Sequence, residues 1–181
     1  MSRWSGFARR VRVPLGFAFA IVYIWLAKPT LAYMSTGMVL AAAGLLSRAL
    51  ASGHVRKNEQ LATTGPYAYT RNPLYLGSLI LAVGFCIAAR SWWIAAIMVA
   101  FFLLVYIPVI RGEEAFLRGK FPEFDEYTKK VPRLIPRLSS FAASDNEFSW
   151  QLYLQHREYN ALIGALALAA VLIAKLLWSH K

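Results

Sequence analysis

Cysteine, histidine and acidic residues are all scarce in this sequence of 181 residues. The single cysteine, Cys86, lies in an apolar run, so a disulfide framework and a cysteine-based metal site are both excluded. The three histidines are scattered, and no pair of them has the spacing of metal ligands. None of the eleven glycines forms a G-x-G pair, so the phosphate-binding fingerprint of a Rossmann fold is missing.

Apolar residues, by contrast, are abundant. They make up 58% of the chain, and the mean hydropathy is +0.45, which is high for a soluble domain. The net charge of +11 would suggest a nucleic-acid partner in a soluble protein. Here the basic residues flank apolar runs, so they report membrane orientation, and we expect no nucleic acid. We predict a single all-α domain, residues 1–181, built as an integral membrane helical bundle.

Five apolar segments predict about five transmembrane helices. A span needs about 20 residues, within a range of about 17 to 25, so the first and third segments must borrow flanking residues. The basic and apolar N-terminus is like a signal peptide, but it has no convincing small-residue cleavage site and is interpreted as a retained helix. The five segments are Val13–Ala27, Leu31–Ala51, Leu74–Ala89, Trp92–Ile110 and Ala161–Trp178.

The distribution of lysine and arginine predicts the orientation of these spans. With five spans, four basic residues fall on one side of the membrane, and the rest of the 20 fall on the other, together with all nine acidic residues. The four are Lys28, Arg90, Lys175 and Lys181. We therefore expect a cytoplasmic N-terminus, an external C-terminus and an active site that faces the cytoplasm. A chain this short is typical of a bacterial inner-membrane protein.

We expect two long connections on the cytoplasmic side, Ser52–Pro73 between the second and third spans and Arg111–Asn160 between the fourth and fifth. Between the fourth and fifth spans, FPEFDEYTKKVPRLIPRL mixes aromatic with basic residues and contains three prolines, which predicts a broken helix in the headgroup region. EFSWQLYLQHREYN predicts a second interfacial helix that leads into the fifth span.

The segment GPYAYTRNPLYLG, residues 65–77, stands before the third span. Gly65-Pro66 predicts a turn, and Pro73 suits the first turn of a helix. The helix N-terminus has free N–H groups and a positive dipole end, beside which Arg71 and Asn72 could stabilise an anion. The alternative is an aromatic interface belt with a topogenic arginine, and the segment alone does not decide between them.

A second polar segment, RGEEAFL, follows the fourth span. We expect Glu113 and Glu114 close to a helix C-terminus, where the helix dipole disfavours negative charge. They either bind a cation or ribose hydroxyls, or are solvated and help to end the span. If Glu114 faces solvent, it contributes less to a site than Glu113.

The two segments together resemble the membrane-embedded methyltransferases, which include isoprenylcysteine carboxyl methyltransferases and phospholipid N-methyltransferases. The resemblance covers about residues 59–136 and rests on LATTGPYAYTRNPLYLG and EEAFLRGKFPEFDEYTKKVPRLIP, in this order. The family pattern is approximately L-(V/A)-T-x-G-x-Y-x-x-x-R-H-P-x-Y-x-G, then E-E-x-x-L. Asn72 stands where the family usually has histidine, and because asparagine cannot titrate, a proton-transfer role at this position is in doubt.

The resemblance implies S-adenosylmethionine as the methyl donor and names candidate site residues. Arg71, Arg111 and Glu114 are the candidate catalytic residues, and Arg111 is the nearest match to an arginine that holds the substrate in relatives. Glu59 is the weakest cofactor candidate, because relatives place histidine there. The implied cofactor contacts are Glu59, Gln60, Leu61, Ala62, Tyr67, Asn72, Pro73, Leu74, Tyr75 and Glu113.

The predicted reaction is carboxyl O-methylation of a prenylated cysteine or a similar lipid-linked carboxylate, with a substrate that arrives from the bilayer. A carboxylate, with a pKa near 4, needs no base at neutral pH. N-methylation of phosphatidylethanolamine is the alternative, and it requires a base to deprotonate the amine. A sterol-reductase-like NADPH enzyme and a non-catalytic membrane protein are two further alternatives.

Overall fold

A computed structural model describes residues 3–56, 59–141 and 147–179, and within these ranges the chain is helical and has no strand. The prediction of an all-α bundle is therefore confirmed. The α-helices are α1 (Arg3–Leu26), α2 (Leu31–Ser52), α3 (Pro73–Ala89), α4 (Trp92–Phe101), α5 (Ile107–Lys120), α6 (Phe124–Lys130), α7 (Trp150–Gln155) and α8 (Tyr159–Ser179). A 3₁₀ turn, η1 (Gly65–Ala68), and a π turn, η2 (Phe102–Tyr106), complete the elements.

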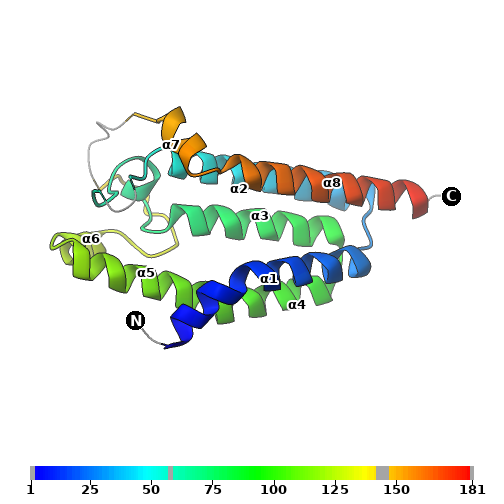
Figure 1. Cartoon of the computed structure of the whole chain (residues 1–181). Helices are drawn as coiled ribbons and strands as arrows, with labels where there is room; N and C mark the ends of the chain where they lie inside the picture. Colours follow the sequence, from blue (N-terminus) through cyan, green and yellow to red (C-terminus); the bar gives the residue numbers. More distant parts are fainter. Residues whose placement is uncertain (1–2, 57–58, 142–146, 180–181) are drawn as a thin grey trace.

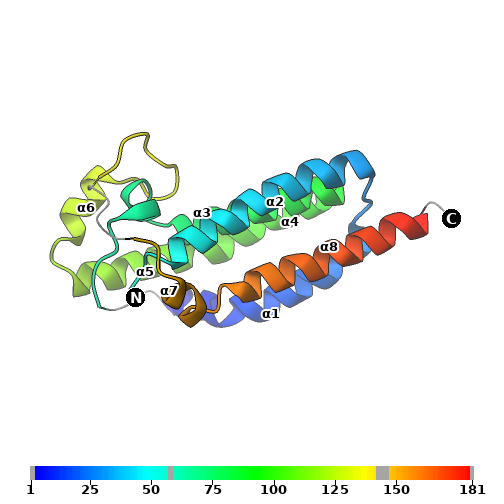
Figure 2. The same ribbon diagram turned by 90° about the horizontal axis from the view of Figure 1, so that it is seen from above.

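The long helices α1, α2, α3, α4 and α8 run along one common direction, as Figures 1 and 2 both show. At one end of this bundle lie η1, α6, α7, the end of α5 and the start of α1. At the other end lie the short connections 27–30 and 90–91 and the C-terminal end of α8. The loops that carry the polar motifs are thus gathered at a single end, which is called the loop end below.

Among the described residues, three helices are long and apolar enough to cross a membrane: Leu31–Ser52, Trp92–Lys120 and Tyr159–Trp178. Two shorter apolar helices, Pro14–Leu26 and Pro73–Ala89, lie beside them and correspond to the first and third predicted segments. Many of their large apolar side chains are exposed, for example Phe17, Trp92 and Leu166. A surface of this kind is expected where lipid is the solvent.

The fourth predicted span does not end at Ile110. The helix continues as α5 to Lys120, so Glu113 and Glu114 lie inside a helix and the predicted position near a C-terminus is wrong. The helix is long enough to leave the apolar layer and carry both glutamates to the loop end. Pro108 does not break it, because this proline stands in the first turn of α5, directly after the π turn.

The stretch after the α5 helix also differs from prediction. Only Phe124–Lys130 is helical, and residues 131–141 form an irregular segment instead of an interfacial helix. This segment packs back on η1: the N–H groups of Arg137 and Phe141 donate to the carbonyls of Tyr69 and Ala68 at 3.0 and 3.1 Å. The second predicted interfacial helix is reduced to the six residues of α7.

Small residues allow α2 and α3 to pack closely. Gly37, Ala41 and Gly44 of α2 face Gly77 and Gly84 of α3. A Cβ atom added to Gly44 would come within 2.5 Å of the Leu81 nitrogen. Backbones that approach this closely gain van der Waals contact in a membrane, where no hydrophobic force drives helices together. The α2–α3 pair is therefore the rigid base on which the loop end is mounted.

We expect Gly84→Val to weaken this base. The new Cβ would lie 2.6 Å from both the Ala41 nitrogen and the Gly37 oxygen, and overpacking of this kind costs about 1–3 kcal/mol. Thermal unfolding in detergent should show a lower midpoint. Gly164→Val is the matched control, because it makes the same change in α8, where the added Cβ would have no described atom of another element within 4 Å. Equal midpoints for the two variants would contradict close α2–α3 packing.

Candidate active site

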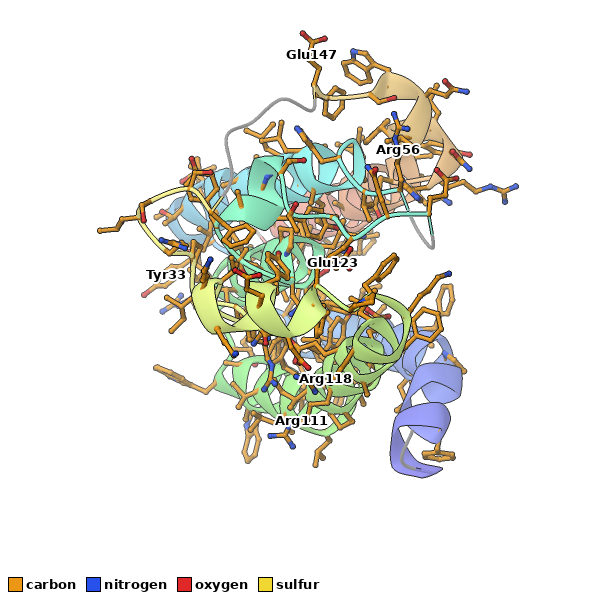
Figure 3. The ribbon with its side chains drawn as sticks, turned by 90° about the vertical axis from the view of Figure 1, so that its left-hand side faces the viewer. Tyr33, Arg56, Arg111, Arg118, Glu123 and Glu147 are labelled. Atoms are coloured by element: carbon orange, nitrogen blue, oxygen red, sulfur yellow. The ribbon has the colours of Figure 1, made fainter. Side chains whose placement is uncertain are left out.

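A cavity of about 490 Å³ opens at the loop end, between residues 55–56 and 60–62, the start of α3, α5 and α6. This volume falls in the range of about 300–1,000 Å³ that small-molecule sites occupy. Figure 3 views this end of the molecule. The lining residues are Val55, Arg56, Gln60, Leu61, Ala62, Tyr67, Arg71, Asn72, Leu74, Tyr75, Glu113, Glu114, Phe116, Leu117, Phe124 and Tyr127.

The cavity brings together most of the residues that the resemblance assigned to the cofactor. Those that line it are Gln60, Leu61, Ala62, Tyr67, Asn72, Leu74, Tyr75 and Glu113. Two do not: Glu59 is exposed outside the lining, and Pro73 is buried behind it as the first residue of α3. Pro73 therefore starts the helix, as the sequence predicted, and acts on the site only through its neighbours.

Glu113 is half-buried in the cavity wall and faces α3. The Tyr75 hydroxyl donates to Glu113 Oε1 at 2.9 Å, and the Tyr75 ring packs edge-on against Tyr106 in the π turn, with 5.7 Å between centroids. Tyr67 lies in the same wall, and burial raises the pKa of its hydroxyl, with Tyr127 and Glu113 adding to the rise. Tyr67 therefore stays neutral and can donate a hydrogen bond to a ligand.

Glu114 is buried, with only 6% of its surface exposed, and does not face solvent. Arg133 reaches it with two nitrogens: Nη2 lies 2.8 Å from Oε2, and Nε lies 3.0 Å from the same oxygen. Asn72 Nδ2 donates to Oε1 at 3.2 Å, and Arg71 Nη2 lies 3.6 Å away from Oε1. The hydrogen bond to Glu114 raises the pKa of Arg133. A lesser contribution of Glu114 was predicted only if it faces solvent, and that condition is not met.

The sequence predicted that Arg71 and Asn72 stabilise an anion beside the start of α3. In the structure, the carboxylate of Glu114 occupies this place. The Asn72 amide, which the sequence suggested as a donor to a ligand, is engaged by Glu114 and by the Arg133 carbonyl at 3.0 Å. Arg71 faces the same carboxylate. Asn72 therefore joins α3, α5 and the segment after α6, a role that needs hydrogen bonding and no titration.

Sequence reasoning missed Arg133. It lies in the irregular segment that follows α6, where prolines and basic residues predicted a broken helix in the headgroup region. The segment is fixed by the Arg71 N–H, which donates to the Pro132 carbonyl at 2.9 Å, and by the Thr70 hydroxyl, which donates to the Arg133 carbonyl at 3.1 Å. The only sequence signal was the proximity of Arg133 to the V-P pair in the second family-like block.

Arg111, a predicted site residue, lies outside the cavity, whereas Arg56 lines it. Arg111 is exposed on α5, outside the cavity lining, on the side away from the segment that carries Arg56 (Figure 3). The structure therefore does not bring Arg111 to the site as a substrate-holding residue. Arg56, which was not among the predicted site residues, lines the cavity and is exposed.

A second ion pair lies behind the α3 wall of the cavity. Arg48 Nη2 of α2 contacts both carboxylate oxygens of Glu158, at 2.7 and 3.0 Å, and Nη1 contacts the Ser78 hydroxyl. Glu158 directly precedes α8. The pair therefore attaches the start of α8 to α2 and α3, close to Leu74 and Tyr75.

A family model described as phospholipid methyltransferase matches residues 15–123, which is more than half of the chain. The chain belongs to the phospholipid methyltransferase family. The match includes the cavity residues from Val55 to Leu117 and ends before Arg133. It agrees with the resemblance found in the sequence, and it makes the protein a member of a family of membrane methyltransferases.

Three curated relatives extend this result. The chain is 41% identical over 118 residues to a nickel-cobalt-cadmium resistance protein, NccN, of Alcaligenes xylosoxydans, covering 65% of this chain and 54% of the relative. It is 36% identical over 137 residues to a cobalt-zinc-cadmium resistance protein, CzcN, of Cupriavidus metallidurans, covering 75% and 61%.

The third relative is a protein-S-isoprenylcysteine O-methyltransferase of Schizosaccharomyces pombe, 26% identical over 144 residues and again covering 75% and 61%. The chain thus spans between about half and two thirds of the length of these relatives. No solved structure matches the chain.

We expect Glu114→Gln to destabilise the loop end more than Glu113→Gln. Removing the Glu114 charge leaves Arg71 and Arg133 without their shared anion, and breaking a buried ion pair costs roughly 3–5 kcal/mol, here about 3 because Arg133 is partly exposed. Glu113→Gln keeps an amide oxygen that can accept from the Tyr75 hydroxyl, so it loses only the charge assistance of that bond, worth about 1 kcal/mol. Thermal unfolding of the unliganded protein in detergent measures both. A larger loss for Glu113→Gln would show that Glu114 does not hold the loop end together.

Proposed function

We propose that the protein is a membrane-embedded, S-adenosylmethionine-dependent methyltransferase that O-methylates a lipid-linked carboxylate, such as that of a prenylated cysteine. The observation that carries the proposal is the cavity at the loop end. It gathers the family-pattern residues of the start of α3 and of α5 at one end of an apolar bundle. A site in this position can receive a water-soluble donor from one side and a lipid from the other.

The cavity residues fit the donor. Glu113 and the Tyr67 hydroxyl offer an anion and a polar hydrogen-bonding group, which suit ribose hydroxyls and an amino group, and Leu61, Leu74 and Phe116 offer apolar walls. When bound, S-adenosylmethionine supplies a methyl group activated by a positively charged sulfur. The chain's own residues have to orient the acceptor and exclude water, which is where much of the rate of such displacements arises.

A carboxylate acceptor is favoured over an amine because both glutamates of the cavity already accept hydrogen bonds from the protein. An amine must lose a proton before it can attack, and this requires a free base in the cavity. Glu114 is held by Arg133 and Asn72, and Glu113 accepts a hydrogen bond from Tyr75. A carboxylate needs no such base. N-methylation of phosphatidylethanolamine is the second candidate, and it would require Glu113, which lines the cavity, to give up its hydrogen bond from Tyr75 and act as that base.

The two bacterial relatives are named for metal resistance. We propose that this chain carries out methyl transfer and holds no metal ion in the cavity. In the described part of the chain, no three His, Cys, Asp or Glu side chains lie together in an arrangement that could hold a metal ion. The carboxylates of the site are engaged by arginine, asparagine and tyrosine instead.

We further propose that the loop end faces the cytoplasm of a bacterial cell. Because the start of α1 lies at the loop end and the end of α8 at the other, the positive-inside distribution applies to the whole bundle. In a Cys86→Ala background, a membrane-impermeant thiol reagent added to intact cells should label Lys28→Cys and should not label Ser139→Cys. Both positions are exposed. Labelling of Ser139→Cys alone would invert the proposed orientation.

The decisive test of the activity is transfer of a radiolabelled methyl group in detergent to N-acetyl-farnesylcysteine and, separately, to phosphatidylethanolamine. We expect product with the first acceptor and stabilisation of the protein against heat by S-adenosylhomocysteine. Product with phosphatidylethanolamine alone would select the second candidate. Stabilisation by NADPH in place of S-adenosylhomocysteine would overturn both.

Glu113→Gln should weaken S-adenosylhomocysteine binding by about 1.5–3 kcal/mol, the range for a hydrogen bond that involves a charged group. Isothermal titration calorimetry measures this on folded protein. Glu123→Gln is a control of the same chemistry, because Glu123 is exposed just before α6 and is not among the residues that line the cavity. If Glu113→Gln and Glu123→Gln bind the ligand equally well, Glu113 does not contact the donor.

A further inference from the structure

Arg71 has hydrogen-bonding capacity that the protein does not use. Its side chain is 12% exposed, and its Nε atom is buried with no hydrogen-bond partner. Buried polar groups in folded proteins almost always have a partner, and a guanidinium has five N–H donors in a fixed planar fork. A buried, unpartnered Nε beside a cavity therefore indicates that a group from outside the protein completes the site.

The carboxylate of Glu114 does not meet this need. Arg133 already contacts it with two nitrogens at 2.8–3.2 Å, whereas Arg71 Nη2 stays 3.6 Å away, beyond hydrogen-bonding distance. The cluster thus contains two cations, Arg71 and Arg133, and one anion. The second positive charge is left for a ligand that carries a negative one.

The position of Arg71 is fixed, and its side chain lines the cavity. Its backbone N–H is bonded to the Pro132 carbonyl, and its neighbours Thr70 and Asn72 are both buried and hydrogen-bonded to the segment after α6. Tyr127 lies close enough to Arg71 for the guanidinium charge to oppose the rise in the Tyr127 pKa that burial causes, and its hydroxyl donates to the Tyr67 carbonyl at 2.6 Å. The guanidinium is therefore held in the wall before any ligand arrives, as pre-organised recognition requires.

We propose that Arg71 forms the oxyanion subsite of the acceptor, a specificity-determining contact that the sequence resemblance placed at Arg111. The planar fork of arginine matches a carboxylate or a phosphate with two parallel hydrogen bonds. The inference rests on the proposed methyltransferase function. The oxyanion is either the carboxylate of a lipidated cysteine or the phosphate of a phospholipid headgroup, and the experiment separates these sources.

The experiment compares binding of N-acetyl-farnesylcysteine with binding of its carboxamide, which has the same shape without the charge. Wild-type protein should bind the carboxylate about tenfold to a hundredfold more tightly, as a charge-assisted bidentate contact implies. In Arg71→Gln the two ligands should bind within about threefold of each other. Phosphatidylethanolamine is titrated in parallel, and loss of its binding in Arg71→Gln with no change in the carboxylate preference would assign the subsite to phosphate.

Two further variants keep the result interpretable. Arg118→Gln removes an arginine of α5 that pairs with Asp125 at an exposed site, so it should keep the carboxylate preference. Arg71→Lys retains the charge and loses the fork, so it should show an intermediate preference, and it replaces Arg71→Gln if that variant does not fold. Binding of S-adenosylhomocysteine by the same samples tests the proposed function separately. An unchanged preference for carboxylate and unchanged binding of phosphatidylethanolamine in the Arg71 variants would overturn the inference.

Discussion

The buried carboxylate of Glu114 is the contact on which the loop end depends. It is reached by Asn72 from the start of α3 and by Arg133 from the segment after α6, while Glu114 itself belongs to α5. Three pieces of chain that are far apart in the sequence thus meet at one anion. Since the cavity lies among these same pieces, its shape depends on the hydrogen bonds and ion pairs that Glu114 makes. A charge buried in this way is tolerated only because its partners are charged or polar and well aligned.

This cluster would have no fixed position without the rigid pair of helices behind it. Gly44 and Gly77 bring α2 and α3 into backbone contact, and the same absence of a side chain at Gly77 makes room for Arg48. Arg48 uses that room to bind Glu158 ahead of α8. The close packing in the apolar layer and the ion pair at its edge therefore both depend on the absence of a side chain at Gly77. The start of α3, where Asn72 lies, is held from both sides.

The sequence predicted the parts of this arrangement that depend on local chemistry. The apolar runs, the tight connections, the start of α3 at Pro73 and the grouping of Tyr67, Tyr75 and Glu113 all follow from hydropathy, backbone preference or a family pattern. The long-range partners could not be predicted in the same way. Nothing local distinguishes Arg133 from Arg111, because what decides which of them meets Glu114 is the path of an irregular segment in space. The error at the end of the fourth span had the same origin, since hydropathy marks where the lipid ends and not where the helix ends.

The long fourth helix also explains how two adjacent glutamates acquire different environments. Neighbouring residues of an α-helix point about 100° apart, so Glu113 and Glu114 cannot face the same partner. Glu114 is directed to the ionic cluster, and Glu113 to Tyr75 in the cavity wall. The π turn Phe102–Tyr106 stands between the apolar part of this helix and the glutamates, and a turn of this kind accommodates an extra residue that rotates everything beyond it. The apolar face of α4 and the polar face of α5 can thus be oriented independently. This freedom allows one continuous helix to pack in the apolar bundle and still direct Glu113 to the cavity and Glu114 to the ionic cluster.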